Sequence, residues 1–437
     1  MDVKGSKQIH GRFTLIVVSI SVWIYIIWSL NTSGYFEAWR LWCIPAETPA
    51  FIDFRLIPSG AETFRSGIDP AISNPNDPKG NIFNYPKIWY LFFYTGITQR
   101  DTIWISTVLI FLFFLAVSAF PEKLTTKDSL LMLLVVFSPA AILLYERGNV
   151  DLAFFALCGL AIILVDRFPT WGAVSLLVAS VFKLFPFFGV GVFLSENKNR
   201  FYRYLLICTF IFLTYVAMSF ESLKAAWSLT LRGTRSSYGD LVIFDLFHDL
   251  LHNYFFRLMN GNWVDVLLNV FPHFIALMLL AIAFYFGVKS KYPLSTDSER
   301  NLTAFRMGAC IYLGTFLLGN NWDYRLAFLI FTIPQISRWM SSLRKNHLQY
   351  WSVLGAFVVL LISCWYTFNR CFYLFFTHGK FDFYLTVFDE IMNWFLFFAL
   401  AYLLPVSAPN WVRSFSWKPS WREILKITKV DLNENKS

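Results

Sequence analysis

The stretch TLIVVSISVWIYIIWSL, residues 14–30, carries no charged side chain and is long enough to cross a membrane as a helix. Apolar runs of this kind recur along the 437-residue chain, in which 57% of the residues are hydrophobic and only 15% are charged. Soluble domains carry about 25% charged residues. The sequence therefore predicts an all-α polytopic membrane protein.

The basic residues predict how the chain is oriented. Lys4, Lys7 and Arg12 precede the first apolar run as in a signal peptide, but no small-residue cleavage site follows it, so we expect a retained span. With both termini in the cytoplasm, the cytoplasmic segments hold 21 of the 37 Lys and Arg residues. This bias accounts for the net charge of +9 without a nucleic-acid partner. The segments are 1–12, 121–129, 166–170, 195–203, 288–301, 337–349 and 406–437.

The hydropathy pattern predicts about twelve transmembrane helices in one integral-membrane domain, residues 1–405, because no polar linker divides the chain. Two of the segments are interrupted, at KLFP (183–186) and at Pro334. Interrupted helices at membrane depth usually line a cavity, because their freed backbone groups need partners. The predicted spans lie near 13–30, 101–120, 129–145, 150–166, 170–183, 186–195, 203–220, 264–287, 302–319, 325–337, 350–368 and 388–405.

Two long segments, 31–100 and 221–263, fall on the external side in this topology. The first contains FIDFRLIPSGAETFRSGIDP (51–70), in which Asp53 shares one helical face with apolar residues. We expect an amphipathic helix near 53–66 that lies on the membrane surface. The basic tail 406–437, which is rich in tryptophan, is expected to contact membrane lipids.

Charged and amide side chains gather at the predicted external ends of the spans. Ionisable groups at membrane depth are costly, so they are usually functional or paired. A carboxylate base beside several cations suits a reaction in which a hydroxyl attacks and a phosphate leaves. The residues are Asp53, Glu146, Arg147, Asn149, Asp151, Lys183, Asn320, Asn321, Asp323 and Arg325.

Each of these residues also has a purely structural interpretation. Asp53 suits the first turn of a helix, where the helix dipole favours a carboxylate. Lys183 could extend from an ordinary span to the membrane interface. Two further alternatives are ion pairs, namely Arg147 with Glu146 or Asp151, and Asp323 with Arg325.

An ordered series of motifs runs through residues 50–195: Asp53-Phe54, Ala61, Asp69-Pro70, Tyr85-Pro86, the turn from Arg147 to Asp151, and Lys183 with Pro186. In this order the motifs resemble glycosyltransferase family 87. That family includes polyprenyl-phosphate-mannose-dependent mannosyltransferases and belongs to the GT-C fold class. Beyond residue 195 the resemblance covers only the hydropathy pattern.

The resemblance implies an inverting transferase of the bacterial inner membrane. Such an enzyme moves a sugar, mannose first among the candidates, from a polyprenyl-phosphate carrier to a lipid or glycan acceptor on the outer face. Asp53 matches the family's general base. The family's late external histidine has no counterpart, and Asp323 or Arg325 could replace it. The expected donor-phosphate ligands are Arg147, Asn149, Lys183 and Arg325, and the expected substrate contacts are Asp69, Tyr85, Asp151, Asn321 and Asp323.

Metal and cysteine chemistry receive little support from the sequence. No D-x-D pair occurs, and the nearest approach, Asp297-Ser-Glu299, is cytoplasmic, so we expect neither a nucleotide-sugar donor nor a divalent metal cofactor. His248 and His252 could form a metal pair, but an amphipathic surface helix explains their spacing better. The six cysteines show no CxxC spacing, and a disulfide between Cys43 and Cys371 is one possibility.

Two other functions fit the same pattern. A multi-span transporter or flippase would share the broken helices and buried charges, but it would show internal repeats and balanced loops. A non-catalytic scaffolding subunit would tolerate the loss of Asp53. Both large loops and the candidate residues lie on one side in the predicted topology, which favours an enzyme.

Overall fold

The computed structural model describes residues 3–230, 233, 236–247, 261–290, 294, 296–344, 348–377 and 382–414. These residues form an all-α structure with one short antiparallel β-pair, β1 (Ser237–Tyr238) with β2 (Asn321–Trp322). The α-helices are α1 (Val3–Thr32), α2 (Tyr35–Arg40), α3 (Ile52–Arg65), α4 (Thr102–Ala119), α5 (Thr126–Val136), α6 (Pro139–Arg147), α7 (Asp151–Val165), α8 (Pro169–Phe182), α9 (Lys198–Met218), α10 (Phe220–Ser228), α11 (Val242–Leu246), α13 (Gly261–Lys289), α14 (Glu299–Phe316), α15 (Ile333–Ser342), α16 (Leu348–Cys364), α17 (Tyr366–Thr377), α18 (Asp382–Val406) and α19 (Asn410–Arg413). The 3₁₀ helices are η1 (Lys87–Thr95), η2 (Gln99–Asp101), η3 (Phe185–Ser195) and η4 (Asp323–Thr332).

Five of the described helices are long and apolar enough to cross a membrane, and the number rises to seven if each of two bent pairs forms one span. The protein is therefore membrane-embedded, as the sequence predicts. Both bends measure 59°, one between α5 and α6 and the other between α16 and α17. The straight candidates are His10–Thr32, Gln99–Ala119, Lys198–Met218, Asn269–Lys289 and Asp382–Val406.

The predicted interruptions of the apolar segments are present. Helix α8 ends at Phe182, Lys183 has an extended backbone, and the chain resumes as η3 at Phe185. The second interrupted segment is the 3₁₀ helix η4, which passes into α15 just before Pro334. Helix α7 and the shorter segments α8 and η3 are apolar but too short to count as spans by length.

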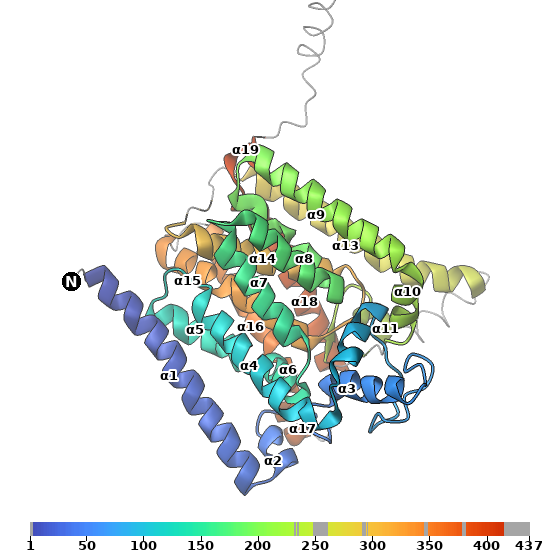
Figure 1. Cartoon of the computed structure of the whole chain (residues 1–437). Helices are drawn as coiled ribbons and strands as arrows, with labels where there is room; N and C mark the ends of the chain where they lie inside the picture. The colour runs from blue at the N-terminus through green and yellow to red at the C-terminus, as the bar shows by residue number, and fades with distance from the viewer. Residues whose placement is uncertain are drawn as a thin grey trace, which may run out of the picture.

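Helix α14 forms the centre of the molecule and is buried along almost its whole length, between η3, η4 and α18. Figure 1 shows α1 along one edge and α9 with α13 along the opposite edge, with α7, α14 and α18 between them. Close packing requires a glycine at Gly314, where a Cβ atom would lie 2.0 Å from Cγ of Phe188. Helix α14 therefore approaches η3 more closely than any side chain larger than hydrogen allows.

The amphipathic helix expected near 53–66 is α3, but its environment differs from the prediction. Phe54, Ile57 and Ala61 are buried against the protein, chiefly against η1, and not exposed along a membrane surface. Gly60 makes this approach possible, because a Cβ there would lie 3.2 Å from the ring of Phe93 in η1 and 2.9 Å from the ring of Phe83 just before it. An apolar stripe shows that a helix face is covered but not whether lipid or protein covers it.

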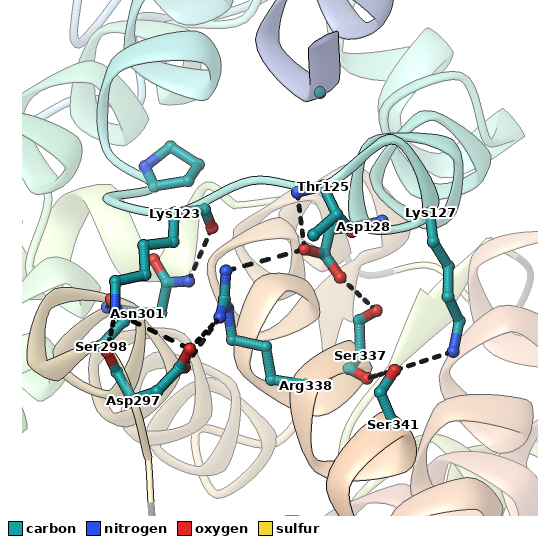
Figure 2. A network of polar contacts seen from close by, with 12 residues as sticks. Lys123, Thr125, Lys127, Asp128, Asp297, Ser298, Asn301, Ser337, Arg338 and Ser341 are labelled. Atoms are coloured by element: carbon teal, nitrogen blue, oxygen red, sulfur yellow. Dashed lines mark hydrogen bonds and ion pairs between the residues drawn. The ribbon is translucent and has the colours of Figure 1, made fainter. Parts of the chain in front are cut away.

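A polar network joins three segments that the sequence assigns to one side of the membrane, 121–129, 288–301 and 337–349 (Figure 2). Both Asp297 carboxylate oxygens lie 2.7 Å from Arg338 Nη1, and Arg338 Nη2 lies 3.9 Å from Asp128. The Asn301 side chain donates to the carbonyl of Lys123 at 3.0 Å. These three segments therefore lie next to one another.

We expect Gly314→Ala to destabilise the protein by about 1–3 kcal/mol, because the new methyl group forces the Phe188 ring out of its place. The same change at Gly355 in α16 is the matched control, since no atom from the surrounding protein lies within 4 Å of the position that a Cβ would take there. That control should be neutral or slightly stabilising. The temperature at which the detergent-solubilised protein loses its monodisperse gel-filtration peak measures both effects. Equal melting of the two variants would contradict this description of the α14–η3 contact.

Candidate functional site

Six side chains from four separate parts of the chain meet in one polar cluster. Asn149 lies at its centre: its amide nitrogen donates to Asp53 Oδ2 at 2.7 Å, and its carbonyl oxygen accepts from Lys183 Nζ at 3.4 Å. Lys183 also contacts Asp151 Oδ1 at 2.5 Å. Arg325 Nε lies 3.5 Å from the other oxygen of Asp151, and Arg325 also donates to Asn321.

The turn between α6 and α7 positions Asn149 and Asp151. Gly148 ends α6 with a left-handed backbone (φ 57°), and a Cβ there would lie 2.8 Å from Cβ of Phe51. A glycine at this position lets the segment before α3 approach the turn, which brings Asp53 within reach of Asn149. Asn149 also accepts the backbone N–H of Asp151 at 3.0 Å, so its amide orientation is defined on both sides.

The two cations of the cluster come from the two apolar segments that the sequence marks as interrupted. Lys183 follows the last residue of α8, and its ammonium group lies 5.8 Å from the ring centre of Tyr85. Arg325 lies in the first turns of η4, 5.0 Å from the ring centre of Phe185. Both side chains are largely buried, with exposed fractions of 15% and 17%. Carboxylates and aromatic faces thus replace the water that these cations lose.

Arg147 makes the ion pair that the structural interpretation anticipates. It contacts Glu146 at 3.2 Å and Glu47 at 2.7 Å, and it donates to the carbonyl of Pro45 at 2.9 Å. It does not replace Lys183 or Arg325 at Asp151. Its positive charge nevertheless acts on Asp53, so Arg147 borders the cluster as an electrostatic neighbour.

The pKa of Asp53 reflects these surroundings. Burial raises the pKa above its usual value, while the charge of Arg147 and the hydrogen bond from Asn149 oppose the rise. The net direction is upward. A carboxylate with a raised pKa is a stronger proton acceptor, which is a property that a general base needs.

Two of the expected substrate contacts lie outside the cluster. Asp69 accepts a hydrogen bond from the Tyr90 hydroxyl at 2.6 Å and another from the backbone N–H of Ala71, and so stabilises the loop after α3. Asp323 is buried, and burial raises its pKa to about 8. The proposed pairing of Asp323 with Arg325 is absent from the described ion pairs, since Arg325 is directed to Asp151 and Asn321.

Tyr324 belongs to the cluster but was not predicted. It is buried beside Asn149 and interacts electrostatically with Arg325, Asp151 and Asp53. The only feature of the sequence that points to Tyr324 is its position between Asp323 and Arg325. The chain has twenty tyrosines, so this position alone gives little reason to select it.

An apolar cavity of about 610 Å³ is lined by sequence neighbours of the cluster residues, although none of the six cluster side chains lines it. Its wall includes Phe54, which follows Asp53, Val150, which separates Asn149 from Asp151, and Phe182, which precedes Lys183. Trp104 and Val178, at its rim on α4 and α8, have exposed fractions of 58% and 42%. The cavity thus borders the backbone segments that carry Asp53, Asn149 and Lys183, and its wall includes exposed apolar side chains of α4 and α8.

The described residues contain no group of three or more His, Cys, Asp or Glu side chains that could hold a metal ion. His248 and His252 lie outside the described residues, as does the tail from residue 415 onward. Comparison of the chain with models of known protein families, with curated proteins and with solved structures gives no match. The geometry of the cluster is therefore the basis for assigning a function.

We expect Lys183→Met to lower the melting temperature markedly, because it leaves the fully buried Asp151 with only the longer contact to Arg325. Removing one partner of a buried ion pair costs about 3–5 kcal/mol. Lys127→Met is the control, since Lys127 makes an exposed contact with Ser341 at 2.9 Å. Thermal unfolding in detergent at neutral pH measures both, and equal stability of the two variants would refute the role of Lys183 in neutralising Asp151.

Proposed function

We propose that the protein is a membrane glycosyltransferase that moves a sugar from a polyprenyl-phosphate carrier to a hydroxyl of a lipid or glycan acceptor. One observation carries the proposal. A single amide, Asn149, holds a carboxylate with a raised pKa at one end and a buried ammonium group at the other. A base for the attacking hydroxyl and a cation for the leaving phosphate are thereby fixed at a common centre.

In the proposed reaction, Asp53 accepts the proton of the acceptor hydroxyl as its oxygen attacks the anomeric carbon. The bond between that carbon and the phosphate oxygen breaks, and the phosphate leaves with the bonding pair. Lys183 and Arg325 stabilise the negative charge that develops on it. Attack from the face opposite the leaving group inverts the configuration at the anomeric carbon.

The charges of the cluster support this sequence of events. Lys183 and Arg325 together carry two positive charges, which Asp151 and Asp53 balance while no substrate is bound. When Asp53 takes up the proton it becomes neutral, and one positive charge becomes available just as the phosphate gains negative charge. The site therefore avoids a large change in net charge within a poorly solvated region.

The apolar cavity supports a lipid-linked donor. Its lining includes one ionisable group, Asp101, which is engaged by the backbone N–H of Thr98 at 2.8 Å and the indole of Trp104 at 3.0 Å. The remaining wall offers no charged group to a ligand, as a hydrocarbon chain requires. The rim on the outer faces of α4 and α8 would let such a chain enter from the bilayer.

A transport function is the second candidate, and buried carboxylates within a span favour it. Asp389 and Glu390 of α18 are 2% and 1% exposed, and the amide of Asn393 reaches both at 3.4 Å and 3.5 Å. Ionisable groups inside a span often mark a proton or ion pathway. We rank this function second because none of the described hydrogen bonds or ion pairs joins these carboxylates to the Asn149 cluster.

The central prediction concerns Asp53→Asn. This change keeps the hydrogen-bonding shape but removes the base, so we expect transfer to fall by at least about 100-fold. The assay offers polyprenyl-phosphate-linked mannose and other lipid-linked sugars to purified protein in lipid, with a membrane extract as the source of acceptor. Label in a new glycolipid is the readout.

Glu37→Gln serves as the control, because Glu37 is an exposed carboxylate of the same external segment. Full activity of Asp53→Asn would remove Asp53 from the mechanism. Absence of transfer with every donor, together with substrate-dependent flux of protons or ions in vesicles, would favour the transport function instead.

The acid limb of the pH–rate profile gives an independent prediction. Asp53 acts as a base only when ionised, so kcat/KM should fall as the pH decreases through its raised pKa, above the ordinary range of about 3.9 for Asp. Arg147→Gln removes a positive charge that lowers this pKa, so the fall should move to higher pH. Rates measured from about pH 4 to 9 test both points. A shift to lower pH in Arg147→Gln would contradict the assignment.

A further inference from the structure

We infer that Cys43 and Cys371 are a disulfide-forming pair that ties the first external segment to α17 when the protein meets an oxidant. The two cysteines are 328 positions apart, yet Cys371 Sγ lies 3.9 Å from the carbonyl oxygen of Cys43. The two thiols are also close enough to interact electrostatically, and both are partly accessible in the reduced state. This inference does not depend on the proposed function.

The backbone at Cys43 is arranged for this contact. Cys43 has a left-handed conformation (φ 55°), which is unusual and costly for a residue other than glycine. The turn is closed by hydrogen bonds from Cys43 N to Arg40 O at 2.9 Å and from Ile44 N to Trp39 O at 3.2 Å. Trp39 and Ile44 are buried on either side of it, so packing holds the thiol opposite α17.

The four other cysteines are poorer candidates. Cys158, Cys208 and Cys364 are buried, which shields their thiols from oxidants. Cys310 of α14 is partly buried against η3, where its sulfur would lie 2.5 Å from a Cβ at Gly191. It therefore serves as a control thiol that is free but has no cysteine partner among the described contacts.

The Cys43–Cys371 disulfide would restrain a segment that borders the polar cluster. Pro45 and Glu47 follow Cys43 within four residues, and both hold Arg147. Fixing Cys43 to α17 would restrict the movement of this segment and so keep Arg147 near Asp53. The cross-link would also join residues far apart in the chain, which restrains the unfolded state.

The oxidation requires a disulfide as co-reactant, such as oxidised glutathione or the active-site disulfide of a thiol oxidase. The Cys43 and Cys371 thiols lose two protons and two electrons and form one S–S bond. The electrons and protons reduce the co-reactant to two thiols. In the predicted topology both cysteines lie on the external side, where such oxidants are found.

Thiol counting on the purified full-length protein tests the inference. The folded protein is incubated with oxidised glutathione, denatured in N-ethylmaleimide to block free thiols, reduced, and labelled with a polyethylene-glycol maleimide. We expect two labels on the wild-type chain and on Cys310→Ser, but at most one on Cys43→Ser or Cys371→Ser, where a glutathione adduct on the remaining thiol has no neighbouring thiol to resolve it. Non-reducing digestion of the wild type should yield one peptide pair that contains Cys43 and Cys371.

The peptide map decides the question even if a serine variant fails to fold, because it uses only the wild-type protein. Recovery of both cysteines as N-ethylmaleimide adducts would overturn the inference. Separate glutathione adducts on Cys43 and Cys371 without a linked peptide would overturn it as well, since adjacent thiols resolve such adducts into a disulfide.

Discussion

The buried carboxylate of Asp151 imposes the main constraint on this structure. Its side chain is fully inaccessible to solvent, and it is neutralised by Lys183 and Arg325. Because an unpaired charge at this depth would cost several kcal/mol, both cations must reach the first turn of α7. If both segments continued as regular α-helices, the side chains of Lys183 and Arg325 would not both reach Asp151. The break after α8 and the 3₁₀ helix η4 therefore allow two apolar segments to place a cation beside the same carboxylate.

The sequence reveals the class of fold well, but it leaves the paths of individual segments open. Hydropathy identifies α1, α4, α9, α13 and α18, since long apolar runs have few alternatives. The 59° bend between α5 and α6 was missed, although Ser138 as N-cap and Pro139 at the start of α6 are its local signals. The covering of α3 by η1 was also missed, because an amphipathic pattern does not identify what lies opposite the apolar face.

Much of the candidate site could be selected from the sequence by the polarity of its side chains. Asp53, Asn149 and Lys183 stand out in an apolar chain, and the structure brings all three together. Asp69 stands out equally but stabilises a loop, and Tyr324 does not stand out yet lies beside Asn149. Which polar residues converge depends on contacts between distant segments, and a single sequence contains no direct record of those.

The position of the site along the chain has a consequence for how the protein is made. Its members extend from Asp53 to Arg325, so the ribosome has completed about three-quarters of the chain before the last cation emerges. Until then, Lys183 is the one cation of the cluster beside the two carboxylates of Asp53 and Asp151, so the cluster is incompletely neutralised while the chain is still being made. Membrane insertion therefore passes through a partly synthesised chain in which these polar groups lack one of their partners. Insertion chaperones that cover polar helix ends would be needed most before Arg325 has been synthesised.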